Sequence, residues 1–382
     1  MLWLLVVVLC FGLSIAGQTP PAQVSDVIHE QYLIESKTLG EQRSVLVRVP
    51  PGYAVSGRKY PVVYMLDAHP PQNAMMIGVI DQQVWGGMMP EMIVVGIQNT
   101  DRSRDLTPTD DGKGRGPVGG GEKFLRFIEG EVIPLVEKNY RTEPFRIFAG
   151  HSLGGLFAVY ALTARPDLFN AYIAASPVLG WDDNYVIKRA EEVFREKRDW
   201  NKTVFLAIGD EPQYMGGFRD FENLLKQAKP KDLEYEFRQF KDENHGSVVL
   251  RAYYWGLRKI FEGWQPPASG SIADLENHYR KLSKRFGYDI FIPEDLLNRA
   301  GYQMLNAGKI PEAIDLFRKN AEHYPNSANV YDSLGEAFEK NGQLKQAREN
   351  YEKAFAIASR NGDQTRAAVF KANLDRVAEK LK

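Results

Sequence analysis

The sequence predicts an α/β fold, in which helices cover a mostly parallel sheet, followed by a small all-helical module. From about residue 25 to 265, short β-branched runs alternate with amphipathic segments of helix length. Such alternation, with strands that are almost continuously apolar, is typical of a parallel sheet buried on both faces. After residue 271 the strand signals stop, and the remaining chain has helical periodicity. The length of 382 residues fits two or three domains.

The first residues have the features of a signal peptide. Residues 2–16 are almost wholly apolar, and a Gly-Gln-Thr-Pro-Pro segment then ends the run. That length is short for a membrane span and suits the apolar core of a signal peptide. Small residues, Ser14 and Ala16, precede the expected cleavage site, so we expect residues 1–16 to be removed and the mature chain to be periplasmic or secreted. Because no Lys or Arg precedes the apolar run, an uncleaved N-terminal anchor is the alternative.

Charge and cysteine content narrow the range of functions. The formal net charge is −1, which gives no electrostatic reason to expect binding to nucleic acid or to an anionic membrane. The only cysteine, Cys10, lies in the apolar N-terminal segment, so the mature chain is expected to have none. Disulfides, thiol catalysis and thiolate metal sites are thereby excluded. No later segment is long and apolar enough to span a membrane.

Seven segments of the domain over residues 25–265 are predicted strands, because each is a short apolar or β-branched run that ends at turn residues. They are residues 45–49, 60–66, 92–97, 145–149, 171–175, 204–208 and 235–240. Segments such as 122–139 and 218–227 lie between them and have the length and polarity of helices. Parallel strands need crossovers of this kind, so these segments are expected to cover the sheet.

A Gly-His-Ser-Leu-Gly sequence at residues 150–154 matches the G-x-S-x-G pattern of a nucleophile elbow. It directly follows the predicted strand 145–149 and directly precedes a helical run. A serine on such a sharp turn has strained backbone angles, and the flanking glycines allow them. The turn places the hydroxyl of Ser152 at a helix N-terminus, where developing negative charge is stabilised. The order of strand, elbow and helix predicts an α/β-hydrolase fold with Ser152 as nucleophile, rather than a glycine-rich turn with an incidental serine.

A serine nucleophile needs a general base, and in this fold an acid and then a histidine follow the serine in the chain. His245 lies in a polar loop directly after the last predicted strand and is therefore the predicted base. His278 and His323 fall in the helical region and are expected on its surface. The side chain of His151 is expected to point away from the position of the base, and His69 is a candidate lining residue of the pocket.

The acid is expected directly after the predicted strand 204–208, where the chain reads Gly-Asp-Glu-Pro. A carboxylate there can orient His245 and stabilise its imidazolium form. Asp210 and Glu211 both satisfy this requirement. Asp242, in the histidine loop, is a weaker third candidate.

The negative oxygen that forms when a serine attacks a carbonyl group is stabilised by backbone N–H donors, in an oxyanion hole. One donor is expected from Leu153, which follows the nucleophile. The other is expected from the loop after the predicted strand 60–66, at Asp67 or Ala68.

Residues 266–271 are rich in Pro, Ala, Ser and Gly and are predicted to be a linker. In the helical module that follows, residues 272–382, small and aromatic residues recur at a spacing of 34. The recurring pairs are Gly301 and Gly335, Gly308 and Gly342, Ala313 and Ala347, and Phe317 and Tyr351. This pattern resembles tetratricopeptide repeats, at about residues 294–327 and 328–361.

Two repeats bury too little surface to be stable alone, so we expect the helical module to pack on the preceding domain. Segments 272–285 and 365–381 are expected to be capping or docking helices. A module of this kind is also a candidate binding surface for a protein partner.

Several segments resemble the putative esterase family, which includes siderophore esterases, feruloyl esterases, S-formylglutathione hydrolase and mycolyltransferases. The segments are residues 60–67, 104–108, 150–155, 176–177 and 244–247. The resemblance covers roughly residues 25–265, and some members of the family carry C-terminal tetratricopeptide repeats. It implies a serine carboxylic ester hydrolase that acts through an acyl-enzyme on a small or medium ester, of siderophore, feruloyl or acyl type, without a metal or organic cofactor.

The resemblance also bears on two choices that the residues alone leave open, the acid that orients His245 and the second oxyanion donor. Related esterases often have the acid two residues after a glycine, which favours Glu211. They commonly have Asp-Gly where this chain has Asp67-Ala68, so the resemblance does not choose between these two residues for the second oxyanion donor. Two other functions are compatible with the sequence: an acyltransferase on the same fold, and a non-catalytic scaffold that binds partners through the repeats.

Overall fold

The computed structural model describes residues 29–114, 116–196, 198–267 and 270–382. The expected signal peptide, residues 1–16, lies outside the described residues, as do residues 268 and 269 of the predicted linker. Within the described ranges, none of the helices combines the length and the hydropathy that a membrane span requires.

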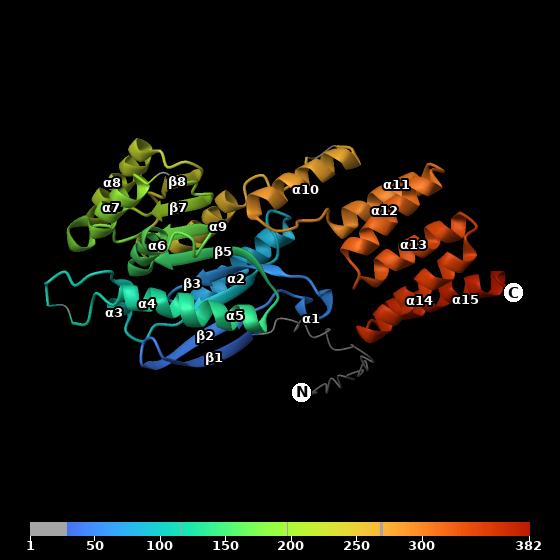
Figure 1. Cartoon of the computed structure of the whole chain (residues 1–382), viewed down its shortest axis with the longest axis horizontal. Helices are drawn as coiled ribbons and strands as arrows, with labels where there is room; N and C mark the ends of the chain where they lie inside the picture. The colour runs from blue at the N-terminus through green and yellow to red at the C-terminus, as the bar shows by residue number, and fades with distance from the viewer. Residues whose placement is uncertain (1–28, 115, 197, 268–269) are drawn as a thin grey trace, which may run out of the picture.

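A single eight-stranded sheet forms the centre of the N-terminal domain, in the order β1-β2-β4-β3-β5-β6-β7-β8 (Figure 1). Strand β1 pairs antiparallel with β2, and β2 pairs antiparallel with β4. All pairs from β4 to β8 are parallel. The strands are β1 (His29–Ser36), β2 (Glu41–Arg48), β3 (Tyr60–Met65), β4 (Ile93–Ile97), β5 (Thr142–His151), β6 (Ala171–Ala175), β7 (Lys202–Ile208) and β8 (Leu233–Gln239). The predicted mostly parallel sheet is confirmed, and β1 is a strand that the sequence analysis did not identify.

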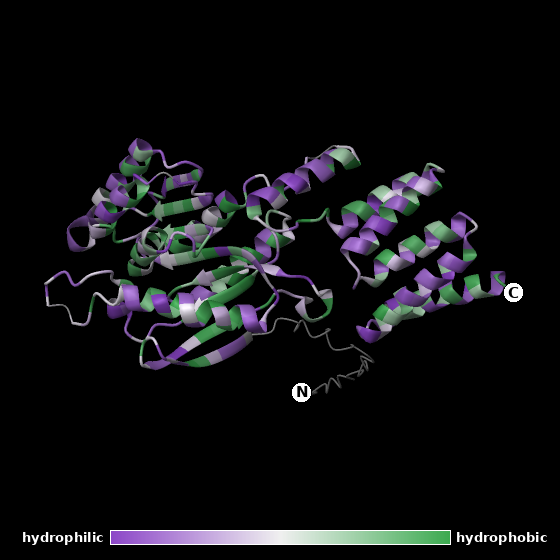
Figure 2. Cartoon of the chain, in the orientation of Figure 1, coloured by the Kyte–Doolittle hydropathy of each residue, from purple (hydrophilic) through white to green (hydrophobic). Residues whose placement is uncertain are grey.

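Helices cover both faces of this sheet, because successive strand residues point to opposite sides. Tyr64 and Phe148 belong to one apolar cluster, whereas their neighbours Val63 and Ile147 belong to another. Helices α4 to α8 cover the first face, and α2 and α9 cover the second. The helices of the domain are α1 (Tyr53–Ser56), α2 (Pro70–Trp85), α3 (Arg102–Leu106), α4 (Gly121–Phe127), η1 (Ile128–Val132), α5 (Ile133–Asn139), α6 (Leu153–Ala164), α7 (Trp181–Phe194), α8 (Pro212–Ala228) and α9 (Val248–Ile260). Figure 2 shows the contrast between the hydrophobic central strands and the mixed helices.

Helices and the turns that connect them make up the described part of the C-terminal module. Its helices are α10 (Ile272–Phe286), α11 (Glu294–Asn306), α12 (Ile310–His323), α13 (Ala328–Lys340), α14 (Leu344–Arg360) and α15 (Gln364–Lys380). Helices α11 and α13 start at residues 294 and 328, 34 positions apart, as do α12 and α14, at 310 and 344. A Cβ atom at Gly301 would come within 2.5 Å of the Phe317 ring, and one at Gly335 within 2.9 Å of the Tyr351 ring. The helix pairs thus follow the period of 34, and their assignment to tetratricopeptide repeats stays a prediction.

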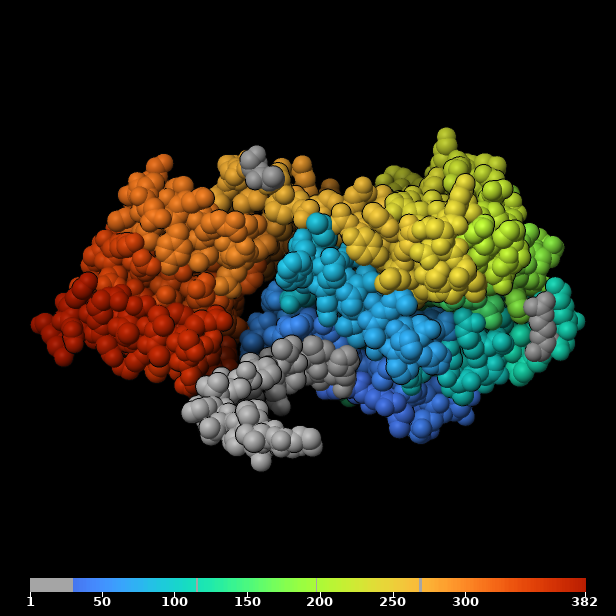
Figure 3. Space-filling model, turned by 180° about the vertical axis from the view of Figure 1, so that it is seen from behind, coloured from blue at the N-terminus to red at the C-terminus, as the bar shows by residue number. Residues whose placement is uncertain are grey.

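The helical module shares apolar contacts with the N-terminal domain. The capping box of Ser271 and Asp274 starts α10. The ring of Phe286 at the end of α10 lies 5.0 Å from Phe145 and 5.2 Å from Phe261 of the N-terminal domain. Further along, the side chain of Asn326 donates a hydrogen bond of 3.2 Å to the carbonyl of Ser56, the last residue of α1. The space-filling view in Figure 3 shows the module, in orange and red, beside the rest of the molecule.

Candidate active site

Ser152 lies at the tip of the turn between β5 and α6. Its φ angle is 61°, a conformation that is rare for residues other than glycine. The N–H group of Ser152 donates to the carbonyl of Ala175 at 2.9 Å, and its carbonyl accepts from Leu156 at 2.9 Å. A Cβ atom at position 150 would lie 2.2 Å from the carbonyl oxygen of Gly154, so only glycine fits there. The local structure is therefore the strained strand-to-helix turn that the motif predicts.

His245 lies in the loop between β8 and α9, and its ring bridges the serine and an acid. Its Nε2 is 2.9 Å from the hydroxyl of Ser152. Its Nδ1 is 2.5 Å from Oε2 of Glu211. A proton on Nδ1 that is donated to the carboxylate leaves Nε2 unprotonated and able to accept the serine proton. Ser152, His245 and Glu211 follow the C-terminal ends of β5, β8 and β7, which parallel pairing brings to one edge of the sheet.

Glu211 is buried, with 2% of its surface exposed, and both of its oxygens are occupied. Oε1 accepts from the hydroxyl of Ser176 at 2.5 Å and from the N–H group of Gly209 at 2.9 Å. Burial acts to raise the pKa of Glu211, but the hydrogen bonds from Ser176, His245 and Gly209 outweigh it and hold that pKa below its usual value. The carboxylate is therefore charged at neutral pH and can stabilise a positive imidazolium.

The two other candidate acids do not contact the base. Asp210 has an exposed side chain, and its N–H group donates to the carbonyl of Glu243 at 2.7 Å. Asp242 pairs with Arg251 at 2.6 Å instead. Of the alternatives that the sequence left open, the structure places Glu211 against His245. The physical reason is the turn after β7, which points Asp210 to solvent and Glu211 into the interior.

The expected oxyanion donors have different surroundings. Leu153 is the first residue of α6, so its N–H group is one of those that have no partner within the helix. The prediction of Ala68 is wrong, because its N–H group donates to the carbonyl of Ile97 at 3.2 Å and is not available. Asp67 adopts a left-handed conformation, with φ 56°, which turns the chain toward β4 and gives Ala68 this partner. The N–H group of Asp67 has no hydrogen bond within the described ranges, so Asp67 remains the candidate for the second donor.

The loop after β3 is attached to the elbow by Arg102, which the sequence analysis did not single out. Its guanidinium group donates to both carboxylate oxygens of Asp67, at 2.7 and 2.9 Å. It also donates to the main-chain carbonyl of His151 at 3.0 Å. This arrangement keeps the Asp67 loop against the turn that carries Ser152. No sequence signal points to Arg102, because the residues it joins come from separate strands.

Two predictions about the remaining histidines are wrong. His151 does not point away from the base, since its Nε2 lies 2.7 Å from the main-chain oxygen of His245. His278 and His323 are half-buried rather than on the surface: His278 lies 3.1 Å from the carbonyl of Trp264, and the His323 ring stacks on Phe291 at 4.1 Å. His69 is exposed in front of α2. No cluster of three or more His, Cys, Asp or Glu suited to a metal ion exists among the residues that the structure describes.

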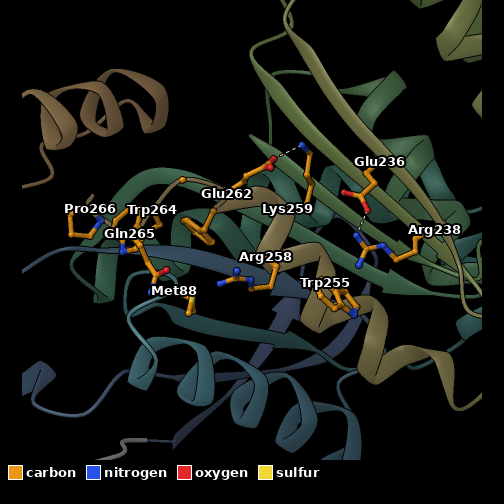
Figure 4. Close-up of a pocket in the computed structure, with 12 residues that line it drawn as sticks. Met88, Glu236, Arg238, Trp255, Arg258, Lys259, Glu262, Trp264, Gln265 and Pro266 are labelled. Atoms are coloured by element: carbon orange, nitrogen blue, oxygen red, sulfur yellow. Dashed lines mark hydrogen bonds and ion pairs between the residues drawn. The ribbon is translucent and has the colours of Figure 1, made fainter. Parts of the chain in front are cut away.

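A separate hollow of about 470 Å³ lies at the far end of α9 (Figure 4). Arg238 lies over the ring of Trp255 there at 4.3 Å, and Lys259 pairs with Glu262 at 2.6 Å. The hollow is lined by Met88, Glu236, Arg238, Trp255, Arg258, Lys259, Phe261, Glu262, Gly263, Trp264, Gln265 and Pro266. It contains none of the residues bonded to Ser152 or His245, so the chemistry expected of the serine belongs elsewhere.

Comparisons with known proteins show that the N-terminal domain is similar to esterases. A family model described as "Putative esterase" matches residues 36–257. Ferri-bacillibactin esterase BesA of Bacillus subtilis is 32% identical over 220 residues, which are 50% of this chain and 75% of that protein. The siderophore triacetylfusarinine C esterase of Aspergillus fumigatus is 30% identical over 200 residues, which are 44% of this chain and 67% of that protein.

Two solved structures extend the likeness. The IroE-like serine hydrolase from Shewanella oneidensis has a TM-score of 0.68 at 30% identity, and the match covers 78% of this chain and 100% of that one. An uncharacterised protein from Capnocytophaga ochracea has a TM-score of 0.60 at 20% identity, and the match covers 92% of this chain and 99% of that one. The second match shows that this fold, with most of its helical module, occurs in another protein.

Proposed function

The chain belongs to the putative esterase family and is an ester hydrolase, and we propose that it acts through an acyl-enzyme formed on Ser152. The observation that carries this proposal is the hydrogen-bonded series from the Ser152 hydroxyl through His245 to Glu211, with distances of 2.9 and 2.5 Å. A nucleophile, a base within hydrogen-bond reach and a group that orients the base are the parts that nucleophilic catalysis requires.

In the first half of the proposed reaction, His245 accepts the hydroxyl proton on Nε2 while Oγ of Ser152 attacks the ester carbonyl carbon. The carbonyl oxygen takes the negative charge, which the N–H groups of Leu153 and Asp67 stabilise. Such donors typically lower the barrier by about 3–4 kcal/mol each. The carbon–oxygen bond to the alcohol then breaks, and His245 gives its proton to the leaving alkoxide.

In the second half, water attacks the acyl group on Ser152 and gives one proton to His245. The tetrahedral intermediate collapses, the acid product leaves, and the proton returns to the oxygen of Ser152. Glu211 stays ionised throughout, since its function is to hold the Nδ1 proton and to stabilise the imidazolium. The enzyme thus returns to its starting state, and the reaction consumes only the ester and one water molecule.

For the substrate, we propose an ester of the siderophore type. BesA and the Aspergillus fumigatus relative are both named as siderophore esterases. The accessibility of the reacting groups supports a bulky substrate, because the side chain of His245 is 34% exposed and Ser152 is half-buried at the turn. An ester much larger than a simple acetate can therefore approach the hydroxyl.

The test compares purified wild-type chain with Ser152→Ala on a panel of a ferric siderophore ester, a feruloyl ester, an acetylated sugar and a nitrophenyl acetate. We expect kcat/KM to be highest for the siderophore ester, and Ser152→Ala to lower turnover by roughly 10⁴-fold with the fold intact. Full activity of Ser152→Ala contradicts the mechanism. A feruloyl ester or acetylated sugar as the preferred substrate contradicts only the substrate class.

Secretion through residues 1–16 and partner binding through the helical module also remain proposals. Edman sequencing of the protein recovered from its native host tests the first, with Gly17 expected as the new N-terminus. An N-terminus at Met1 in the mature protein supports the uncleaved anchor instead.

A further inference from the structure

The second residue of the elbow contacts the loop of the general base. His151 follows Gly150 at the end of β5, and its Nε2 lies 2.7 Å from the main-chain oxygen of His245. The two imidazole rings are 4.7 Å apart between centroids, at an angle of 45°. Because a carbonyl oxygen only accepts, the neutral His151 ring must carry its proton on Nε2 and donate it.

The residues beside His245 have main-chain anchors of their own, whereas His245 does not. The carbonyl of Glu243 accepts from Asp210 at 2.7 Å, and that of Asn244 accepts from Val248 at 3.1 Å. For His245, the ring of His151 is the one group that bonds to its main chain in the part of the protein that the structure describes. Glu211 holds the ring of His245, and His151 holds the main chain that carries this ring.

His151 is itself fixed from its other side. Arg102 donates to its carbonyl at 3.0 Å and holds Asp67 by two hydrogen bonds of 2.7 and 2.9 Å. A continuous series of contacts therefore joins the loop that carries the second oxyanion donor, the elbow and the loop of the base. These three parts come from different strands, and their relative placement decides whether proton transfer is geometrically possible.

We infer that His151 is a positioning residue, which holds His245 in line with Ser152 through the hydrogen bond from its Nε2–H group to the His245 carbonyl. The inference rests on the proposed function of Ser152 and His245. A misplacement of about 1 Å in such a pair can lower turnover by about 10²-fold. The ring of His151 bonds to the main chain of His245 and not to the Nε2 atom that takes the proton, so its loss is expected to change kcat rather than KM.

The charge state of His151 fits this function. Burial lowers the pKa of His151, and the nearby His245 lowers it further, while the hydrogen bond to the His245 carbonyl and the charge of Asp67 act in the opposite direction. A neutral ring beside His245 avoids repulsion when His245 takes the serine proton and becomes positive.

Two variants separate the hydrogen bond from the packing. His151→Phe keeps a ring of similar size and removes the donor, whereas His151→Gln restores an N–H group at the end of the side chain. With a nitrophenyl ester, we expect His151→Phe to lower kcat by about 10–100-fold with KM within about twofold of wild type. We expect His151→Gln to return kcat to within about fivefold of wild type. The matched control is His278→Ala, which removes a similar imidazole-to-carbonyl contact, of 3.1 Å, far from the site and is expected to leave kcat unchanged.

The inference is overturned if His151→Phe turns over at the wild-type rate, or if both variants lose the same activity together with a lower melting temperature. Should His151→Phe fail to fold, His151→Gln decides: kcat within about fivefold of wild type supports the inference, and a loss of about 100-fold or more overturns it. Ser152→Ala is measured in parallel. If it keeps full activity, the proposed function fails; if it is inactive while His151→Phe is unaffected, only the positioning of His245 fails.

Discussion

Replacing Glu211 by glutamine removes the charge of the acid and keeps its size. The outcome is decided by the two donors on the far side of the carboxylate, the Ser176 hydroxyl and the Gly209 N–H group, at 2.5 and 2.9 Å from Oε1. Both require an acceptor, so the glutamine oxygen takes the Oε1 position and its NH₂ group faces Nδ1 of His245. Nδ1 must then accept, and the imidazole proton moves to Nε2.

In that tautomer, Nε2 donates to Ser152 and cannot take its proton. We therefore expect Glu211→Gln to lower kcat by about 10³–10⁴-fold with little change in KM, equivalent to about 4–5 kcal/mol of lost transition-state stabilisation. The assay is turnover of a nitrophenyl ester, with circular dichroism to verify folding. Asp210→Asn is the matched control, because it changes the adjacent exposed carboxylate in the same way and should leave kcat unaltered. Equal losses in the two variants, or more than a tenth of wild-type kcat in Glu211→Gln, would show that Glu211 does not set the tautomer of His245.

Three further predictions concern pH and the helical module. Activity should fall in acid, because a protonated His245 cannot accept the serine proton, and a pH–rate profile that stays flat down to pH 4 argues against this base. Hydrogen bonds from Arg376, Lys380 and Tyr351 lower the pKa of Glu339 from 4.5 to about 2, although burial opposes them. The ionised Glu339 side chain therefore stabilises the fold fully above about pH 4.5, and this stabilisation is lost as the pH falls toward 2. Solvent weakens these ion pairs because the partners are partly exposed, so Glu339→Gln should lower the free energy of unfolding by only about 1–2 kcal/mol at pH 7, and by much less at pH 2.5. Denaturant titrations measure this difference, and an equal loss at both pH values contradicts the lowered pKa of Glu339. Truncation after Gly270 should lower the melting temperature, because it removes Phe286 from its contacts with Phe145 and Phe261. The truncated chain should still turn over a short nitrophenyl ester, and a folded but inert truncated chain shows that the helical module contributes to catalysis.

The strands that are buried on both faces could be predicted from the sequence, because burial on two sides requires an unbroken apolar run. Strand β7 is an example, since its predicted part, residues 204–208, is wholly apolar and buried. The two residues that precede this run, Lys202 and Thr203, are buried but polar, and the prediction did not include them. Strand β1 could not be identified in this way. It is an edge strand that pairs with β2 alone, most of its residues are polar, and its Leu33 is 61% exposed. Its place in the sheet depends on main-chain pairing, which leaves little trace in composition.

Within the site, the nucleophile and the base were predictable because each occupies a fixed point in the order of strands and loops. The choice between Asp210 and Glu211 depended on the resemblance to related esterases, which favours Glu211, and the structure agrees. The chain itself left both residues open, since adjacent side chains point in different directions and the local turn decides which of them faces inward. The incorrect expectation for Ala68 has a similar origin, in the left-handed conformation of Asp67. Ser176 and Arg102 act through contacts between separate strands, and such contacts are not visible in a single sequence.

Labelling by a fluorophosphonate shows which serine is the nucleophile, because this reagent forms a covalent bond with a serine that an adjacent base activates. The purified chain is treated with the reagent, and the modified peptide is located by mass spectrometry. We expect one adduct per chain, on Ser152, with no adduct in Ser152→Ala and much slower labelling in His245→Ala and Glu211→Gln. An adduct on another residue, or labelling that is equally fast without His245, would contradict the assignment of Ser152 as the activated nucleophile.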